Sequence, residues 1–175
     1  MDPPTVPIDR LGGWRHVERT TERPFSAGPV SVTAGTVRYE RVDVPVPRPF
    51  FFASRLRIRP SSSPNRALTR LVESRAKTGF RGRLADHDIV DVEPHDERSV
   101  AVDDPEATDA TLVTYRGRCL VASDHEVPVE ALLAVWEAGE YLLAGGAYRI
   151  DGEGEVDPDG ARRELLGLVR GVRSA

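Results

Sequence analysis

Cysteine and lysine are almost missing from this 175-residue sequence, which has one cysteine, Cys119, and one lysine, Lys77. A single cysteine excludes an internal disulfide framework and any zinc site built mainly from cysteines. No stretch approaches the roughly 20 apolar residues that a membrane-spanning helix needs. The first residues lack both the basic region and the apolar region of a signal peptide. We therefore expect a cytoplasmic protein.

Aromatic residues are also scarce, at 6% of the chain, whereas arginine supplies 23 of the 24 basic side chains. Arginine is more weakly hydrated than lysine and pairs with carboxylates through two hydrogen bonds. A GC-rich genome accounts for this preference, and the net charge of −4 is in keeping with a halophilic archaeon or an actinobacterium. The arginine content therefore indicates habitat more than function.

Length and composition indicate one globular domain. Apolar residues make up 39% of the chain and charged residues 30%, which favours a folded protein over a disordered one. Residues 1–10 hold three prolines and few apolar side chains. We therefore expect a flexible N-terminal arm over residues 1–10 and a single α+β domain over residues 11–175.

The charge is unevenly distributed along the chain. Residues 1–83 carry 16 Lys or Arg against 7 Asp or Glu, a net charge of +9, and residues 84–175 carry 8 against 21, a net charge of −13. Such asymmetry is typical of a nucleic-acid-binding surface. It also arises when basic strands pair with acidic strands inside one sheet, and we favour this second interpretation.

Three strands are expected in the N-terminal third. A Thr/Val-rich strand over Val30–Glu40 follows an earlier strand that begins near Trp14, and the two are joined near Ala27-Gly28-Pro29. Three prolines within residues 45–49 then break the sheet, since proline cannot donate a hydrogen bond to a strand ladder. The next strand is Phe50–Arg59, where Leu56 and Ile58 face one way and Arg55, Arg57 and Arg59 the other.

A helix is expected directly after this strand. The serines at 61–63 offer an N-cap, Pro64 suits the first helical position, and Gly79 suits a C-cap. Its apolar face comprises Ala67, Leu68, Leu71 and Val72.

Three further patterns add strands. Ile89–Val102 predicts a hairpin that turns at Pro94–Glu97, and Thr111–Val121 predicts a single strand. The segment Glu130–Ala144 allows a helix by propensity. The pair Ala138-Gly139 between two apolar runs instead favours a second hairpin, which we choose.

A closing helix begins at Pro158 after the capping residue Asp157, with Leu165, Leu166 and Val169 at helical spacing. Strands thus outnumber helices, and they cluster in antiparallel pairs instead of alternating with helices. This order predicts an α+β fold, an antiparallel β-sheet flanked by two main helices, and argues against a doubly wound fold.

Four short stretches resemble an uncharacterised family of haloarchaeal proteins: Gly13–Glu18, Phe25–Ala27, Ala144–Tyr148 and Leu165–Arg170. The order of elements is similar to the Mog1/PsbP-like fold, an antiparallel sheet flanked by helices. This resemblance covers most of residues 13–173 and supports the hairpin over the segment that ends at Tyr148. Proteins of that fold mostly bind other proteins or act as assembly factors. The resemblance therefore implies an interaction module, and it supplies no catalytic residue.

Two segments carry residue types that ligate metals. Asp86, His87 and Asp88, with His95 nearby, lack the histidine spacing of known zinc motifs. Acidic residues alternate over residues 151–159, but the calcium-loop pattern fails, because Val156 stands at its glycine position and Arg162 at its twelfth position. We interpret both segments as solvated loops and predict no metal and no cofactor.

Nucleophilic catalysis also lacks a signature. The chain has no Gly-x-Ser-x-Gly elbow. Cys119 lies mid-strand, where packing is the usual role, although a neighbouring arginine can lower the pKa of a thiol. Gly145-Gly146 does not open a helix, as a phosphate-binding loop must, and it favours a bulge or a close approach of two backbones. We therefore lean toward a protein without catalytic activity.

The arginines of the Phe50–Arg59 strand are the most suggestive surface feature. Together with Arg48, Arg66 and Arg70, Arg55, Arg57 and Arg59 would form a basic patch that contacts phosphates. Asp91 and Glu93 on a neighbouring strand would be natural partners for them. The chain also has no RNP, KH or helix-turn-helix motif. Nucleic-acid binding is therefore not favoured.

The sequence favours a non-catalytic binding or scaffold protein that engages another protein through the sheet face or the loops. One alternative is a small-molecule binder with a pocket near Trp14, Trp136 and Tyr148, although we favour core or edge packing for these aromatic side chains. The other alternative is a nucleic-acid-associated protein that uses the Arg-rich N-terminal half.

Overall fold

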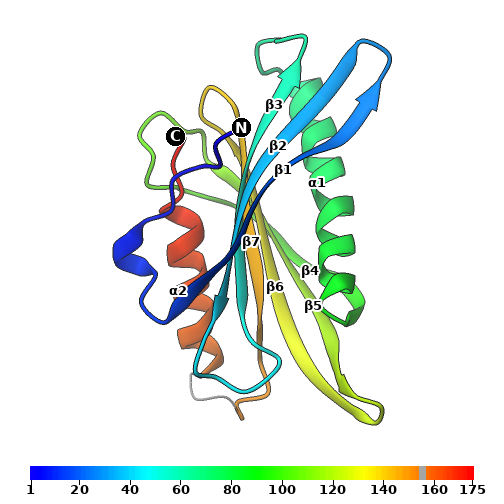
Figure 1. Ribbon diagram of the computed structural model, residues 1–175, viewed down its shortest axis with the longest axis vertical. Coiled ribbons are helices and arrows are strands. Elements are labelled where there is room, and N and C mark those ends of the chain that lie inside the picture. Colours follow the sequence, from blue (N-terminus) through cyan, green and yellow to red (C-terminus); the bar gives the residue numbers. More distant parts are fainter. Residues whose placement is uncertain (154–156) are drawn as a thin grey trace.

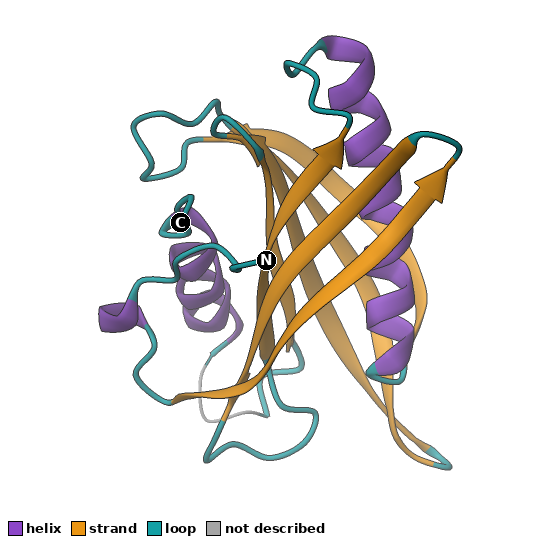
Figure 2. Ribbon diagram, turned by 45° about the horizontal axis from the view of Figure 1, so that its top comes forward, coloured by secondary structure: helices purple, strands orange, loops and turns teal. Residues whose placement is uncertain are grey.

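A computed structural model describes residues 1–153 and 157–175 of the chain. A seven-stranded antiparallel sheet forms the middle layer. Helix α1 (Arg66–Asp86) packs on one face of the sheet, and helix α2 (Pro158–Arg170) packs on the other (Figures 1 and 2). This arrangement confirms the predicted α+β class with an antiparallel sheet and two flanking helices.

The sheet consists of two antiparallel meanders that meet at its centre. The first comprises β1 (Trp14–Ala27), β2 (Val30–Arg41) and β3 (Phe50–Arg59). The second comprises β4 (Ile89–Val100), β5 (Ala110–Ala122), β6 (His125–Glu137) and β7 (Tyr141–Arg149). Their order in the sheet is β1-β2-β3-β7-β6-β5-β4. Helix α1 carries the chain from β3 to the far edge, so that β7 returns to pair with β3.

Two predicted hairpins are confirmed, and each turns at a glycine with positive φ. Gly28 joins β1 to β2 with a φ of 56°, and Gly139 joins β6 to β7 with a φ of 72°. Glycine adopts this left-handed region without steric cost. Local propensity allowed either a helix or a hairpin over Glu130–Ala144, and the structure has the hairpin, with its turn at Gly139.

The predicted hairpin over Ile89–Val102 is wrong, because Ile89–Val100 form one strand, β4, at the edge of the sheet. The expected turn residues lie inside this strand, where the pairing with β5 shifts register beside Val90 and beside Pro94. An edge strand tolerates proline, since the missing N–H costs no ladder hydrogen bond when that side faces solvent. The turn signals therefore mark bulges and not a reversal of the chain.

Helix α1 begins later and ends later than predicted. Asn65, and not the serines at 61–63, caps the helix by accepting a hydrogen bond from the Leu68 N–H (3.0 Å), so Pro64 lies outside it. The helix also continues through Gly79 to Asp86. A glycine costs a helix interior about 1 kcal/mol. Phe80 and Leu84 beyond it are buried, and each contributes roughly 1.5–3 kcal/mol, so the longer helix is favoured.

The buried face of α1 follows a single i, i+4 row. This row comprises Leu68, Val72, Ala76, Phe80 and Leu84. Of the four apolar residues predicted for this face, Leu68 and Val72 pack on the sheet. Ala67 is exposed and Leu71 is 48% exposed. The prediction was therefore wrong for Ala67 and Leu71. The helix packs on the sheet through one i, i+4 ridge of side chains, and these two residues lie outside that ridge.

Helix α2 begins as predicted. The Asp157 side chain accepts a hydrogen bond from the Gly160 N–H (2.9 Å), and Pro158 is the first helical residue. Leu165 and Val169 are buried against the sheet, as their spacing indicates, while Leu166 lies at the margin of the same core.

Residues 1–10, predicted as a flexible arm, lie against the α2 side of the domain. Thr5 and Arg173 exchange two backbone hydrogen bonds (2.9 and 3.0 Å). Val6 is buried in the core, and a short 3₁₀ helix spans Ile8–Arg10. These contacts attach the arm to the segment that follows α2, and its flexibility stays a prediction.

Two apolar clusters hold the three layers together. One lies between the sheet and α2 and includes Phe51, Leu132 and Leu168. The other lies between the sheet and α1 and includes Phe52 and Phe80. Successive strand residues point to opposite faces, so the Phe50–Phe52 run supplies both clusters. No helix in the described part of the chain has the length and apolar character to cross a membrane.

Candidate functional site

The loop between β2 and β3, residues 42–49, separates two hollows at one end of the sheet. Its three prolines keep it out of the strand ladder, as the sequence predicts. Pro47, Tyr148 and Arg149 line both hollows. We call the hollow on the α2 side the tryptophan pocket and the hollow on the α1 side the loop groove.

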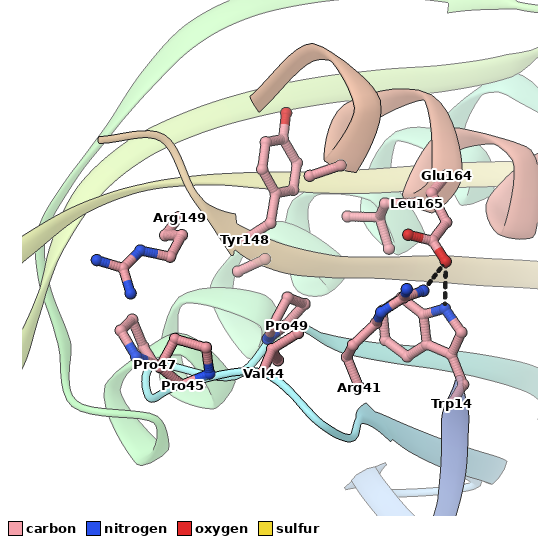
Figure 3. Close-up of a pocket in the computed structure, with 12 residues that line it drawn as sticks. Trp14, Arg41, Val44, Pro45, Pro47, Pro49, Tyr148, Arg149, Glu164 and Leu165 are labelled. Atoms are coloured by element: carbon pink, nitrogen blue, oxygen red, sulfur yellow. Dashed lines mark hydrogen bonds and ion pairs between the residues drawn. The ribbon is translucent and has the colours of Figure 1, made fainter. Parts of the chain in front are cut away.

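The tryptophan pocket is closed by a polar contact with α2. Glu164 accepts a hydrogen bond from Trp14 Nε1 (3.0 Å) and forms an ion pair with Arg41 (Figure 3). The free space that remains is about 30 Å³, which holds a few waters at most. This pocket is therefore too small for a metabolite.

The structure brings together two of the three aromatic residues that the sequence grouped. Trp14 and Tyr148 line the tryptophan pocket. Trp136 does not: it is 3% exposed inside the core. On the β6–β7 ladder Tyr148 pairs with Glu130, whereas Trp136 pairs with Leu142 near the opposite end. The predicted three-residue pocket is therefore wrong, because strand register separates its members.

The loop groove is the larger hollow, with free space of about 350 Å³. Its apolar lining includes Phe50, Ile89, Val121, Val129 and Ala147. Its charged or titratable lining includes Glu40, Arg48, Asp86, His87, Asp88 and Arg149. The groove thus offers an apolar surface bordered by side chains of both signs.

Two exposed apolar side chains belong to this groove. Val46, on the proline-rich loop, is 61% exposed, and Leu120, on β5, is 43% exposed. Neither residue belongs to a motif that predicts a binding site. Val46 was recognisable as an apolar residue between two prolines, and so outside any strand. Leu120 is exposed because it lies near the end of β5, and the local sequence does not specify where that strand ends.

His87 lies directly after α1 and is held against the groove. Its ring stacks on Phe50 with ring centroids 3.8 Å apart and planes 6° apart. Its Nε2 atom is 3.5 Å from Nη2 of Arg38. Burial, and then the positive charge of Arg38 and Arg83, lower the pKa of His87. The imidazole is therefore neutral near pH 7 and presents an aromatic face more than a charge.

Cys119 borders the same groove but is poorly suited to nucleophilic chemistry. Its Sγ donates to the backbone oxygen of His87 (3.5 Å). Burial and the nearby Asp88 raise the pKa of the thiol. The neighbouring Arg118 is engaged by Asp91 and Glu126. A thiol that stays protonated is a weak nucleophile.

The predicted arginine ladder is partly paired, but not with the predicted partners. Arg55 forms an ion pair with Glu140 in the β6–β7 turn, and Arg57 lies 3.9 Å from the same carboxylate. Arg59 is exposed. Asp91 pairs instead with Arg118, since β7, β6 and β5 separate β3 from β4. The predicted pairing of the ladder with Asp91 and Glu93 is therefore wrong.

A buried carboxylate that the sequence analysis missed lies beside the tryptophan pocket. Glu130 on β6 accepts hydrogen bonds from Tyr148 Oη, Arg162 and Arg116. Burial acts to raise the pKa of Glu130, but the Tyr148 hydrogen bond and the Arg162 charge more than offset it, and the net shift is downward. Burial and Glu130 raise the pKa of Tyr148. The ion pair with Arg162 attaches α2 to the sheet. In the sequence, Glu130 stands out as a charged residue within the apolar run of β6, and this position could have indicated a buried carboxylate.

The two histidines of the first candidate metal segment lie apart. His87 faces the loop groove, while His95 is exposed on the edge strand β4. The acidic segment 151–159 includes residues 154–156, which lie outside the described residues. Within residues 1–153 and 157–175, no group of three His, Cys, Asp or Glu side chains has an arrangement that could hold a metal ion.

Comparison with protein families places the whole domain in one known sequence group. The model of a domain of unknown function, DUF6517, matches residues 3–173. No curated protein and no solved structure matches the chain significantly. The matched residues include both meanders and both helices, so the groove and the tryptophan pocket lie inside the family domain.

Proposed function

The chain belongs to the DUF6517 family, a domain of unknown function, and we propose that it is a non-catalytic binding protein that holds a segment of another protein in the loop groove. The observation that carries this proposal is the combination of exposed Val46 and Leu120 with a groove of about 350 Å³. Exposed apolar side chains rimmed by polar groups are typical of protein-binding surfaces.

The composition of the groove favours a peptide segment as its occupant. Protein interfaces combine a desolvated apolar centre with a polar rim. Phe50 and Ile89 provide an apolar floor here, while Arg48 and Asp88 provide charges of opposite sign at the border. An apolar side chain of the partner would enter the groove, and flanking polar groups would meet the charged residues.

The edges of the sheet give a further reason to place the partner at the loops. The edge strand β1 contains Pro24 and two register shifts, and the edge strand β4 contains Pro94 and two register shifts. Bulges, prolines and charges on edge strands oppose the addition of a further strand. A partner segment is therefore better accommodated in the groove than along a sheet edge.

The resemblance to an uncharacterised haloarchaeal family and to the Mog1/PsbP-like fold remains part of this proposal. It is supported by the antiparallel sheet with one helix on each face. Fold-level analogy is a weak basis for function, so the groove and not the resemblance carries the proposal. We place the protein in the cytoplasm, because its single cysteine cannot form the internal disulfides common in secreted domains.

Site-specific photo-crosslinking in the native lysate tests the proposal. A photoreactive amino acid is placed at position 46 or 120 and, as a matched control, at Leu71, an exposed apolar residue on α1. We expect one and the same protein to be captured from positions 46 and 120 but not from 71. Adding Leu120→Asp to the position-46 probe should reduce capture roughly tenfold, which corresponds to about 1.4 kcal/mol.

Two results would contradict the proposal. Equal capture from all three positions would show nonspecific contact, and no capture from 46 and 120 would remove the groove as a protein-binding site. A small organic molecule that copurifies with the wild-type protein and is lost from Leu120→Asp would instead assign the groove to a small-molecule binder.

A further inference from the structure

The outward side of α1 carries a concentration of positive charge that the proposed function does not use. Arg66, Arg70, Arg75 and Arg81 are all exposed, and none forms an ion pair with any residue that the structure describes. Lys77, on the same helix, does form an ion pair, with Glu97 (3.0 Å). At 3.6 residues per turn, Arg66, Arg70 and Arg81 fall within about 60° of one another around the helix, and we call these three residues the α1 arginine face. Arg75 lies on the opposite flank of the helix, toward Phe25 of β1.

One of these arginines is held in place without being neutralised. The Arg81 guanidinium lies 5.8 Å from the centroid of the Tyr115 ring. Contacts with aromatic rings order a guanidinium but leave its positive charge intact. The face therefore includes an ordered cation, Arg81, whose side chain loses little conformational entropy when a partner binds.

The shape of the face suits a long, uniformly charged partner. Arg66 and Arg81 are 15 residues apart, so they span roughly 22 Å along the helix axis. Exposed residues between them are mostly small, and include Ala67, Ser74 and Thr78. Duplex nucleic acid carries one negative charge per about 1.7 Å of its axis, so several phosphates would lie within reach of the three arginines.

The same face lacks what a protein partner needs. Leu71 is its one exposed large apolar residue among the described residues of α1, whereas protein interfaces depend on apolar and aromatic anchors at their centre. Nucleic-acid interfaces are more polar and much more positively charged. The face also has no exposed aromatic ring in the described helix on which single-stranded bases could stack.

We propose that the α1 arginine face binds the phosphate backbone of duplex nucleic acid without reading its sequence. This surface is independent of the loop groove, so either proposal can fail without the other. The sequence predicted a basic patch that combined Arg66 and Arg70 with Arg48 and the strand arginines 55, 57 and 59. The face proposed here keeps only the two helix residues of that patch, because Glu140 lies beside Arg55 and Arg57.

Fluorescence anisotropy with labelled duplex DNA and duplex RNA of about 20 base pairs tests this proposal. For three phosphate contacts, affinity should fall roughly 40-fold between about 50 and 200 mM salt. Arg70→Gln and Arg81→Gln should each weaken binding and reduce the salt slope by about 1. The matched control is Arg15→Gln on β1, an exposed arginine paired with Glu40 (3.3 Å), which removes the same charge elsewhere and should leave binding nearly unchanged.

Three results would overturn the proposal. One is the absence of binding at the lower salt concentration, and another is a salt slope that Arg70→Gln and Arg81→Gln leave unchanged. The third is equal or tighter binding of polyglutamate, which would assign the face to acidic proteins. Binding to one duplex type alone supports the proposal and identifies the nucleic acid.

Discussion

At the scale of single residues, two glycines allow the backbones at the centre of the sheet to approach closely. A Cβ atom added to Gly146 would overlap the carbonyl oxygen of Phe50, and one added to Gly145 would overlap that of Leu132. The sequence pattern predicted a close backbone approach at this pair, and the structure confirms it. Gly79 is different, since a Cβ atom there would meet open space.

Gly146→Ala should therefore reduce the free energy of unfolding by roughly 2–3 kcal/mol, because the new methyl group must displace a backbone and not a flexible side chain. Gly79→Ala, inside α1, should instead raise it by about 0.5–1 kcal/mol. Urea unfolding followed by circular dichroism measures both variants. A neutral Gly146→Ala would mean that the two strands lie further apart than described here.

His87 makes stability depend on pH at the residue scale. Burial lowers the pKa of its folded-state imidazole below the ordinary value of 6.5. Between these two pKa values the unfolded chain binds a proton that the folded chain does not, so stability falls as the pH drops below about 6.5. We expect the free energy of unfolding to fall less for His87→Gln than for the wild type between pH 7 and pH 5. Urea unfolding of both proteins at the two pH values measures this difference. Parallel losses would contradict the prediction.

At the scale of elements, the start of α1 shows how several capping signals compete. Ser61–Ser63 and Asn65 are all residue types that cap helices, and Pro64 stands between them. The Asn65 side chain reaches the Leu68 N–H. The helix then presents Leu68 and Val72 to the sheet, so the packing of its apolar row selects the capping residue.

Asn65→Ala should cost about 1 kcal/mol, because it removes the hydrogen-bond acceptor for an otherwise unsatisfied N–H in the first turn. Ser63→Ala is the matched control and should change stability by less than about 0.5 kcal/mol. Urea unfolding of the two variants compares them directly. A larger cost for Ser63→Ala would return the cap to the serines and contradict the described helix start.

At the scale of the whole molecule, ion pairs connect the basic N-terminal half to the acidic C-terminal half. Arg10 pairs with Asp103 (2.9 Å), Arg41 with Glu164, Arg55 with Glu140, and Lys77 with Glu97 (3.0 Å). The two halves thus pair with each other, but none of these four ion pairs joins a basic strand to an acidic strand, as the favoured interpretation of the charge asymmetry expected. Charge left over from this pairing is what forms the α1 arginine face.

The single cysteine reports on the integrity of the whole molecule. Cys119 is buried on β5, and burial and Asp88 raise the pKa of its thiol. We expect a thiol-reactive dye to label the folded protein at least roughly tenfold more slowly than the unfolded protein. Labelling in increasing urea should rise together with the loss of circular dichroism. Rapid labelling without urea would show that β5 opens locally and would contradict a tightly packed second meander.

Local sequence signals were sufficient wherever a short segment decides its own conformation. The turns at Gly28 and Gly139, the cap of α2 at Asp157 and the alternation of Phe50–Arg59 follow from backbone sterics, hydrogen bonding and strand periodicity. These features depend on residues a few positions apart. They were enough to predict the fold class and most of the elements.

The candidate sites required the tertiary structure, because they depend on which strands become neighbours. The return of β7 to β3 brings Glu140 to Arg55 and leaves β4 at an edge. The loop groove likewise combines the β2–β3 loop, the end of α1 and β5. Sequence alone determined the elements and the charge balance of this protein. Long-range strand order, set by burial of the whole core, decided which charges were neutralised and which surfaces stayed open.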